Sequence, residues 1–299
     1  MTSRGASTDR SRVAYILLAC VSVCWAGSYI LTRIATAEIP PATLATARLM
    51  VAYFVLRIWL RLTHADPPSA VPVLWAGYIQ VALFGHAVPL FLIAAVSVNV
   101  PTGEMAVLVA TAPLFAVALS HLFPPVMPAR TTVLGLLVGA LGLLAFFGEP
   151  NAKAIDADWQ SRFILLGAAA SYAMSGRAVA KLPVDNPVVV GSAVTMCAIA
   201  MLLPMSLIFD QPWAICPSRG AIAATMLLGT ASTAVAYVIY YYLIGLGGAA
   251  FASLHHYLVP VLSALLGAAC FGDIPQPRQV LSAASIVFGV YLLRGLARS

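Results

Sequence analysis

The chain has 299 residues, of which 62% are hydrophobic and only 9% are charged, and its formal net charge is +6. Soluble domains carry about 45–50% apolar and about 25% charged residues, so these few charges cannot solvate a soluble protein of this length. The composition excludes a soluble fold and indicates a chain surrounded mainly by lipid, where only helices and closed barrels satisfy the backbone polar groups. Barrel strands alternate apolar and polar residues, whereas the apolar runs here are continuous, so we expect an all-α membrane protein.

A transmembrane helix needs about 20 mainly apolar residues. Charged residues, prolines and glycines divide the chain into ten such segments, which we predict at residues 13–32, 43–62, 73–95, 101–122, 130–148, 161–181, 187–209, 220–243, 249–270 and 277–296. The preceding residues 1–12 are polar and rich in Ser and Arg, and we expect them to be disordered in the cytoplasm.

The Lys and Arg residues of the loops indicate the orientation. With a cytoplasmic N-terminus, ten of them lie on the cytoplasmic side and five on the other, which favours both termini in the cytoplasm. Orientation is a sufficient explanation for the positive net charge. The sequence has no clustered basic stripe, so we expect no nucleic-acid partner.

The spacing of residues along the chain indicates an internal repeat. A shift of 147 residues without gaps superposes prolines, small residues and aromatic residues at the same place in corresponding helices: Leu18 on Leu165, Trp25 on Tyr172, Ser28 on Ser175, Pro113 on Pro260 and Gly142 on Gly289. We therefore predict a first five-helix repeat over residues 13–150 and a second over residues 155–299. An odd number of helices inverts the second copy, which is typical of secondary transporters with a central cavity near the midplane. The alternative is coincidence among helices rich in Ala, Leu and Val.

Polar and aromatic side chains recur on single faces of several predicted helices, and such faces turn towards protein or water. We predict that a substrate cavity is lined by Trp25, Ser28, Tyr29, Tyr78, His86, Tyr172, Ser175, Tyr237, Tyr241, His256 and Tyr257. His256 is favoured over His255 because His255 is rotated by about 100° in a continuous helix. The alternative for each of these groups is a hydrogen bond that joins neighbouring helices.

Buried charges and prolines add further candidates. Arg48 and Glu104 are predicted towards the outer leaflet, where they pair with each other, reach the interface separately or take part in coupling. Pro89, Pro113 and Pro260 interrupt predicted helices and can act as hinges or kinks. The pairs Gly135-x-x-x-Gly139 and Ser285-x-x-x-Gly289 allow close helix packing, so we interpret the fifth and tenth helices as scaffold.

Motifs for other chemistry are missing from the sequence. It contains neither a G-x-x-x-x-G-K-[ST] phosphate loop nor an H-E-x-x-H zinc motif. The five cysteines have no metal-ligand spacing, so we expect no cofactor and no metal. An intramembrane enzyme with a histidine or Glu104 as general base remains a second hypothesis, although it lacks a nucleophile or metal set. A channel needs polar or charged rings, which the sequence does not offer.

Several short motifs carry a resemblance to a known family. They are the stretches at 24–29 (CWAGSY), 111–115 (TAPLF), 257–261 (YLVPV) and 270–273 (CFGD). Together with the ten predicted helices, they resemble the drug/metabolite transporter (DMT) superfamily of the EamA type, within it the YddG-like exporters of aromatic amino acids. The family commonly has Gly-Glu after its fourth and ninth helices, whereas this chain has Phe123-Pro124-Pro125 and Gly272-Asp273 there.

The resemblance implies a multi-pass protein of the bacterial inner (plasma) membrane that functions as a single chain. It implies a secondary transporter that exports small organic metabolites, such as aromatic and hydrophobic amino acids, by alternating access. The export of other metabolites or drugs is the alternative within the same fold. Substrate identity, proton coupling and oligomeric state stay open at this point.

Overall fold

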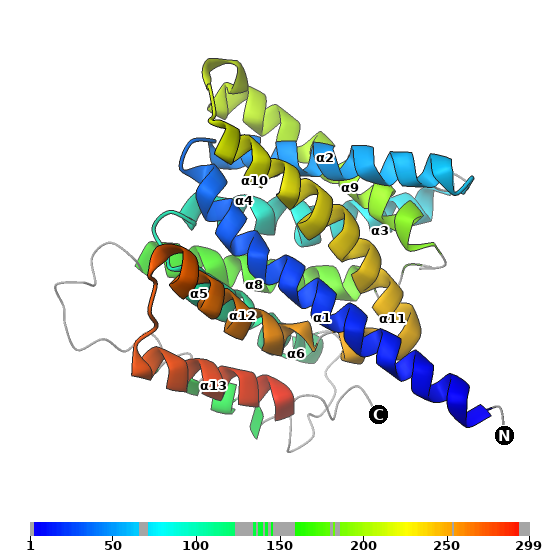
Figure 1. Ribbon diagram of the computed structural model, residues 1–299, viewed down its shortest axis with the longest axis vertical. Coiled ribbons are helices and arrows are strands. Elements are labelled where there is room, and N and C mark those ends of the chain that lie inside the picture. Colours follow the sequence, from blue (N-terminus) through cyan, green and yellow to red (C-terminus); the bar gives the residue numbers. More distant parts are fainter. Residues whose placement is uncertain are drawn as a thin grey trace.

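The structure is a computed structural model of the whole chain. It describes residues 3–65, 71–122, 134–135, 137–139, 141–142, 145, 159–179, 182, 186–252 and 254–292, with the backbone alone at 3–11, 120–122, 247–251, 257 and 290–292. Within these ranges the regular secondary structure is helical and contains no strand (Figure 1), as the composition predicts. The chain folds as an all-helical membrane protein.

The helices follow one another in pieces, several of them separated by short π-helical turns. The first half contains α1 (Ser3–Thr36), α2 (Pro41–Leu62), α3 (Pro72–Ala82), the π turn η1 (Leu83–Ala87), α4 (Val88–Val96), α5 (Thr102–Val109) and α6 (Ala112–Leu122). The second half contains α8 (Trp159–Val179), α9 (Pro187–Met205), the π turn η3 (Ser206–Asp210), the 3₁₀ turn η4 (Pro212–Ala214), α10 (Arg219–Gly229), the π turn η5 (Thr230–Val235), α11 (Ala236–Ala252), α12 (His255–Phe271) and α13 (Pro277–Leu292).

Six helical stretches among the described residues are long and apolar enough to cross a membrane. They are Arg12–Thr36, Pro41–Leu62, Pro72–Val96, Thr102–Leu119, Pro187–Asp210 and Arg219–Leu246. α8 is not among them, although it has 21 residues, since it carries two Arg and several polar side chains. The predicted fifth span, 130–148, lies largely outside the described residues, so the count of ten stays a prediction.

Proline and polar caps fix where helices begin, and one glycine fixes where a helix ends. Pro stands in the first turn of α2, α3 and α9, where a missing N–H costs nothing. Asn186 caps α9 by accepting from the N–H of Val188 at 3.1 Å, and Ser218 caps α10 through the N–H of Ala221. Gly272 ends α12 with a φ of 71°, which a residue with a side chain rarely adopts. These signals are local, so the sequence predicts most helix starts within a few residues.

The helix interruptions differ from the predicted continuous spans. The predicted third span is split by η1, and the predicted eighth span by η5. The predicted fourth span turns at Ala110 and Thr111, just before Pro113. Pro260 lies inside α12 without ending it. π turns are frequent at functional sites, because they insert a residue and free backbone groups.

The first helix of each half packs against the other half. α1 contacts α10, α11 and α12, whereas α8 contacts α3, α4, α5 and α6. The most extensive contact among the described elements joins α2 to α9 (Figure 1). α1 also begins at Ser3, so the backbone predicted as disordered over 1–12 is helical from that residue onwards.

The glycine pairs predicted on the fifth and tenth helices lie against each other. A Cβ atom at Gly289 would meet the backbone N of Gly139 at 2.6 Å and the backbone O of Gly135 at 2.7 Å. A Cβ atom at Gly142 would meet Ser285 at 2.9 Å. The two segments therefore touch backbone to backbone, which small residues permit. α13 itself lies at the edge of the bundle beside α12 (Figure 1).

Candidate functional site

A pocket of about 450 Å³ lies between the two halves of the chain. Such a volume falls in the range of small-molecule sites, roughly 300–1,000 Å³. Its walls come from α1, α2, α3–η1–α4, α5, α6, α8, α11 and α12. The predicted cavity residues that line it are Trp25, Ser28, Tyr29, His86, Tyr172, Ser175, Tyr237, Tyr241 and His256, together with Arg48 and Pro113.

Other predicted residues lie elsewhere. Tyr78 is buried against Trp75 and Tyr241 in a hydrophobic cluster behind the pocket. Pro89 is buried in the first turn of α4, after η1, and does not line the pocket. Pro260 also lies outside the lining. The Tyr257 side chain lies outside the described part of the structure.

An aromatic cluster forms one wall of the pocket. The Trp25 ring lies 5.7 Å from the ring of Tyr237, 5.3 Å from that of Tyr240 and 4.4 Å from that of His255, measured between centroids. Edge-on and tilted contacts of this kind are the favoured geometry of aromatic pairs. Trp25 is only partly buried, so its remaining face is available to a molecule in the pocket.

The π turn η1 brings polar groups to the same wall. His86 stacks on Tyr237 with a centroid distance of 4.2 Å, and the Tyr237 hydroxyl donates to the backbone O of Gly85 at 3.1 Å. Ser175 of α8 packs closely on Gly85, where a Cβ atom would come within 2.4 Å of its hydroxyl oxygen. A side chain at position 85 would therefore force the Ser175 hydroxyl to move.

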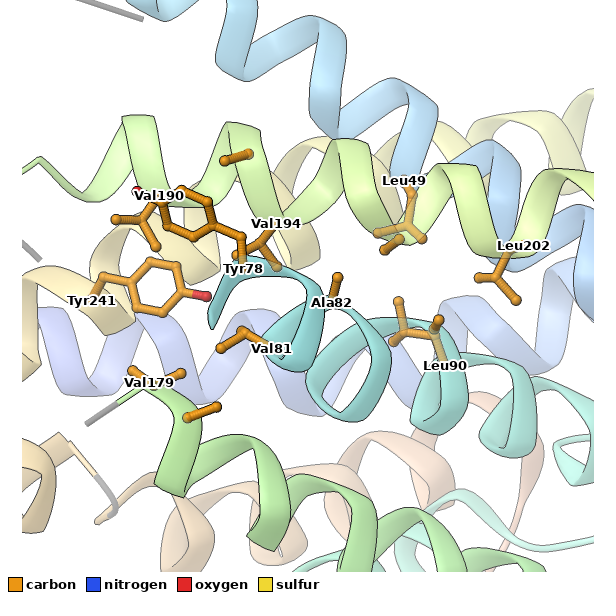
Figure 2. Packing of buried hydrophobic residues seen from close by; sticks show 14 of the residues in the cluster. Leu49, Tyr78, Val81, Ala82, Leu90, Val179, Val190, Val194, Leu202 and Tyr241 are labelled. Atoms are coloured by element: carbon orange, nitrogen blue, oxygen red, sulfur yellow. The ribbon is translucent and has the colours of Figure 1, made fainter. Parts of the chain in front are cut away.

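Two buried polar atoms of lining residues have no hydrogen-bond partner among the described residues. They are Nδ1 of His86 and the hydroxyl of Tyr241. Figure 2 shows the Tyr241 ring next to Tyr78 and Val81, in the cluster where α3, α9 and α11 meet. Buried polar groups normally find a partner, so these two atoms are exceptions in the packing behind the pocket surface.

Arg48 is the buried cation of the pocket. Its side chain is only 6% exposed, and its Nε donates to the Thr233 hydroxyl at 3.0 Å. Thr233 belongs to η5, and its own hydroxyl donates to the backbone O of Leu228 at 2.8 Å, five residues earlier. The π turn thus orients the hydroxyl that receives Arg48.

The predicted pairing of Arg48 with Glu104 does not form. Glu104 instead accepts from Nε of Arg162 at 2.6 Å, and both side chains are largely buried. Arg162 lies at the start of the span predicted over residues 161–181, and nothing in the sequence indicates its partner. α8 begins at Trp159, so Arg162 lies in its first turn, and α8 packs against α5, which carries Glu104 in its first turn.

His255 is a site residue that the helical phase argument set aside. It is buried, lines the pocket and contacts both Trp25 and the ring of His256, whose centroid lies 4.0 Å away. The phase argument assumed one continuous helix over 249–270, whereas α11 runs to Ala252 and α12 begins only at His255. Both histidines lie in the first turn of α12, and the pocket reaches both of their faces, since Val259, on the face of His255, also lines it.

Ionic contacts gather at the end of the bundle that holds the turns after α1 and α12. Arg33 of α1 pairs with Asp273, and its guanidinium lies 4.4 Å from the centroid of the Phe271 ring. Glu38 accepts from the N–H and O–H groups of Ser218 at 2.6 and 2.7 Å. These two hydrogen bonds stabilise the carboxylate and hold the pKa of Glu38 below its usual range.

The described residues hold no cluster of three or more His, Cys, Asp or Glu that could bind a metal ion. The five cysteines are free thiols. The lining combines aromatic faces, hydroxyls, histidines and arginine inside a membrane-embedded helical bundle. Together, the fold and the pocket define a polytopic membrane protein built to hold a small molecule between two halves.

Comparison with known proteins gives the family. The model of the EamA-like transporter family matches residues 12–148 and again residues 161–295. The chain belongs to the EamA-like transporter family.

Relatives and a solved structure extend this assignment. The chain is 27% identical over 271 residues to the inner membrane transporter YedA of Escherichia coli K12, covering 91% of this chain and 87% of YedA. It is 23% identical over 281 residues to the protein PagO of Salmonella typhimurium, covering 93% and 91% of the two chains. A crystal structure with 20% identity superposes with a TM-score of 0.67 over 96% of this chain and 98% of the other, which is a likeness of fold.

Proposed function

We propose that this membrane transporter is a secondary exporter of small organic metabolites, with aromatic and hydrophobic amino acids as its first candidate substrates. One observation carries the proposal. The pocket between the halves combines an aromatic wall around Trp25 with the partly exposed polar side chains of Ser28 and His256. An apolar ring fits such a wall, and these polar side chains suit the polar end of the substrate.

Alternating access needs two halves that move against each other. The residues that line the pocket support two halves that are copies of one repeated unit. Under the shift of 147 residues, lining residues fall on lining residues: Trp25 on Tyr172, Ser28 on Ser175, Thr32 on Val179, Leu90 on Tyr237, Ile93 on Tyr240 and Val109 on His256. The same shift brings Leu83, where η1 begins, onto Thr230, where η5 begins. Two inverted five-helix repeats, 13–150 and 155–299, explain these coincidences best.

We further propose that the chain works alone in the bacterial inner membrane, with both termini in the cytoplasm. The distribution of Lys and Arg residues supports this orientation. The name of the relative YedA, an inner membrane transporter, supports the location in the inner membrane. The turns after α1 and α12 then face the periplasm. Export as the direction of transport rests on the resemblance to exporters of amino acids.

The test is flux in proteoliposomes. Purified protein is reconstituted into vesicles that are loaded with unlabelled L-phenylalanine, and uptake of labelled L-phenylalanine or L-tyrosine is followed by counterflow. We expect uptake well above that of empty vesicles, with labelled glycine as the control that lacks a ring. Uptake equal to that of empty vesicles would remove the amino-acid assignment, whereas counterflow of a different metabolite would keep the transporter and change its substrate.

A further inference from the structure

The environment of Arg48 is unusual for a buried cation. Its one hydrogen bond runs from Nε to Thr233, so its terminal nitrogens form none within the described part of the chain. Neither of the ion pairs of the described residues involves it. A guanidinium is costly to bury without an anion, because the charge loses its water and gains no counter-charge. Arg48 lines the pocket, so its free donors face the space where a ligand would bind.

The other titratable side chains of the lining are cationic or neutral. Arg177 is the second arginine of the described lining, and its Nη1 donates to the backbone O of Leu119 at 3.1 Å. His86, His255 and His256 are its remaining titratable nitrogen groups. The described lining contains no Asp or Glu, and Glu104 nearby is already paired with Arg162. The pocket therefore offers cationic and dipolar partners but no carboxylate.

Tyrosines line the same pocket as the guanidinium. Tyr29, Tyr172 and Tyr237 are among them. Tyr237 in turn contacts Trp25. One ligand can therefore place a flat ring against Trp25 and a negative group at Arg48.

We propose that Arg48 anchors the carboxylate of the substrate, and that the substrate class is a ring-bearing carboxylate anion. This assignment rests on the proposed transport function and includes the aromatic amino acids. The planar guanidinium binds a carboxylate through parallel N–H···O hydrogen bonds. The ammonium group of an amino acid meets no acidic partner in the described lining, so an aromatic monocarboxylate without an amino group binds more tightly than the amino acid.

Three ligands that share a phenyl ring but differ in charge test which charge the pocket prefers. They are 3-phenylpropionate (anion), L-phenylalanine (zwitterion) and 2-phenylethylamine (cation). Binding to the purified full-length protein in detergent is measured by calorimetry and by the fluorescence change of tryptophan. A charged hydrogen bond contributes roughly a 10- to 100-fold change in affinity, so we expect 3-phenylpropionate to bind at least about 10-fold more tightly than 2-phenylethylamine, with L-phenylalanine between them.

Substitution then identifies the anchor. Arg48→Gln should weaken 3-phenylpropionate roughly 10- to 100-fold and leave 2-phenylethylamine unchanged or tighter. Arg48→Lys keeps the charge without the planar fork and should fall between Arg48→Gln and the unchanged protein. Arg61→Gln is the matched control, since this exposed arginine of α2 makes the same change in net charge far from the pocket. The three-ligand comparison on the unchanged protein remains decisive even where Arg48→Gln does not fold.

Two results would overturn the assignment: affinity that is equal for the anion and the cation, or 3-phenylpropionate binding that survives Arg48→Gln unchanged. L-phenylalanine binding more tightly than 3-phenylpropionate would overturn the statement about the ammonium group. If counterflow of L-phenylalanine continues in these cases, the proposed transport function stands without the arginine anchor. If none of the three ligands binds and none is transported, the aromatic assignment of the proposed function fails as well.

Discussion

At the scale of single residues, Trp25 connects the two sides of the pocket. It is on α1, yet its aromatic partners Tyr237, Tyr240 and His255 belong to α11 and α12. The ring is partly exposed, so it is available to a substrate as well as to its neighbours. The same side chain therefore serves both the packing of the helices and the proposed binding of substrate.

Trp25→Ala tests which role is larger. Removing a central aromatic contact of a binding site costs about 2 kcal/mol or more, so transport at low substrate concentration should fall about 30-fold or more while the yield of folded protein stays nearly intact. Trp213→Ala is the control, because Trp213 is 69% exposed in η4 and lies outside the lining. Loss of folded protein in Trp25→Ala alone would mean that the residue is structural.

Glu38 gives a pH-dependent contribution to stability. Its two hydrogen bonds from Ser218 lower its pKa in the folded state, so this contribution is present above the unfolded pKa and is lost as the pH falls through the folded pKa. The difference in melting temperature between the unchanged protein and Glu38→Gln should therefore shrink with falling pH below about 5. A difference that is the same at pH 7 and pH 4 would show that the carboxylate charge does not matter.

At the scale of helices, the close approach of Gly289 to Gly135 and Gly139 fixes the fifth and tenth segments. Gly289→Ala would bring a methyl group within 2.7 Å of backbone atoms that cannot move freely. Overpacking of this kind costs about 1–3 kcal/mol, which should lower the melting temperature. Gly245→Ala in α11 is the control, because nothing lies within 4 Å of its Cβ position. Equal melting temperatures would show that the two segments separate easily.

The sequence predicted the helices better than their interruptions. Apolar runs and proline starts depend on local composition, so α2, α9 and α13 begin within two residues of their predicted positions. The π turns and the break between α11 and α12 depend on packing against other helices, which a single sequence does not reveal. His255 was missed because the lining was expected on one face of the helix, whereas the pocket contacts His255, His256 and Val259. Arg162 was missed because its partner lies in a distant part of the chain.

At the scale of the whole molecule, the pocket lining begins at Thr32 of α1, beside the ion pair of Arg33. The lining continues to Arg177 and Val179, in the last turn of α8, and to His255 at the start of α12. At the other end, Arg33 and Asp273 tie α1 to the end of α12. With the proposed orientation, this ion pair holds the periplasmic ends of α1 and α12 together.

Asp273→Asn should therefore shift the molecule towards the periplasm-facing form. A partly exposed ion pair contributes up to ~1 kcal/mol, which corresponds to about a five-fold change in population. Ser28→Cys, in a background without the native cysteines, reports this shift as faster labelling by an impermeant maleimide added outside the cells. Arg33→Ala should act in the same way, and the two changes should not add, since they break the same pair. Unchanged labelling in both variants would exclude this pair as a latch.

The buried guanidinium of Arg48 has an electrical consequence for the proposed transport cycle. In the empty carrier the charge of Arg48 has no counter-charge among the described residues, whereas a monovalent anion bound to Arg48 neutralises it. The membrane voltage contributes about 2.3 kcal/mol per charge per 100 mV. It therefore acts on the conformational change of the empty protein and hardly on that of the protein with bound anion. A negative cell interior draws that charge inwards, resets the site to the cytoplasmic side and so drives the cycle in the direction of efflux.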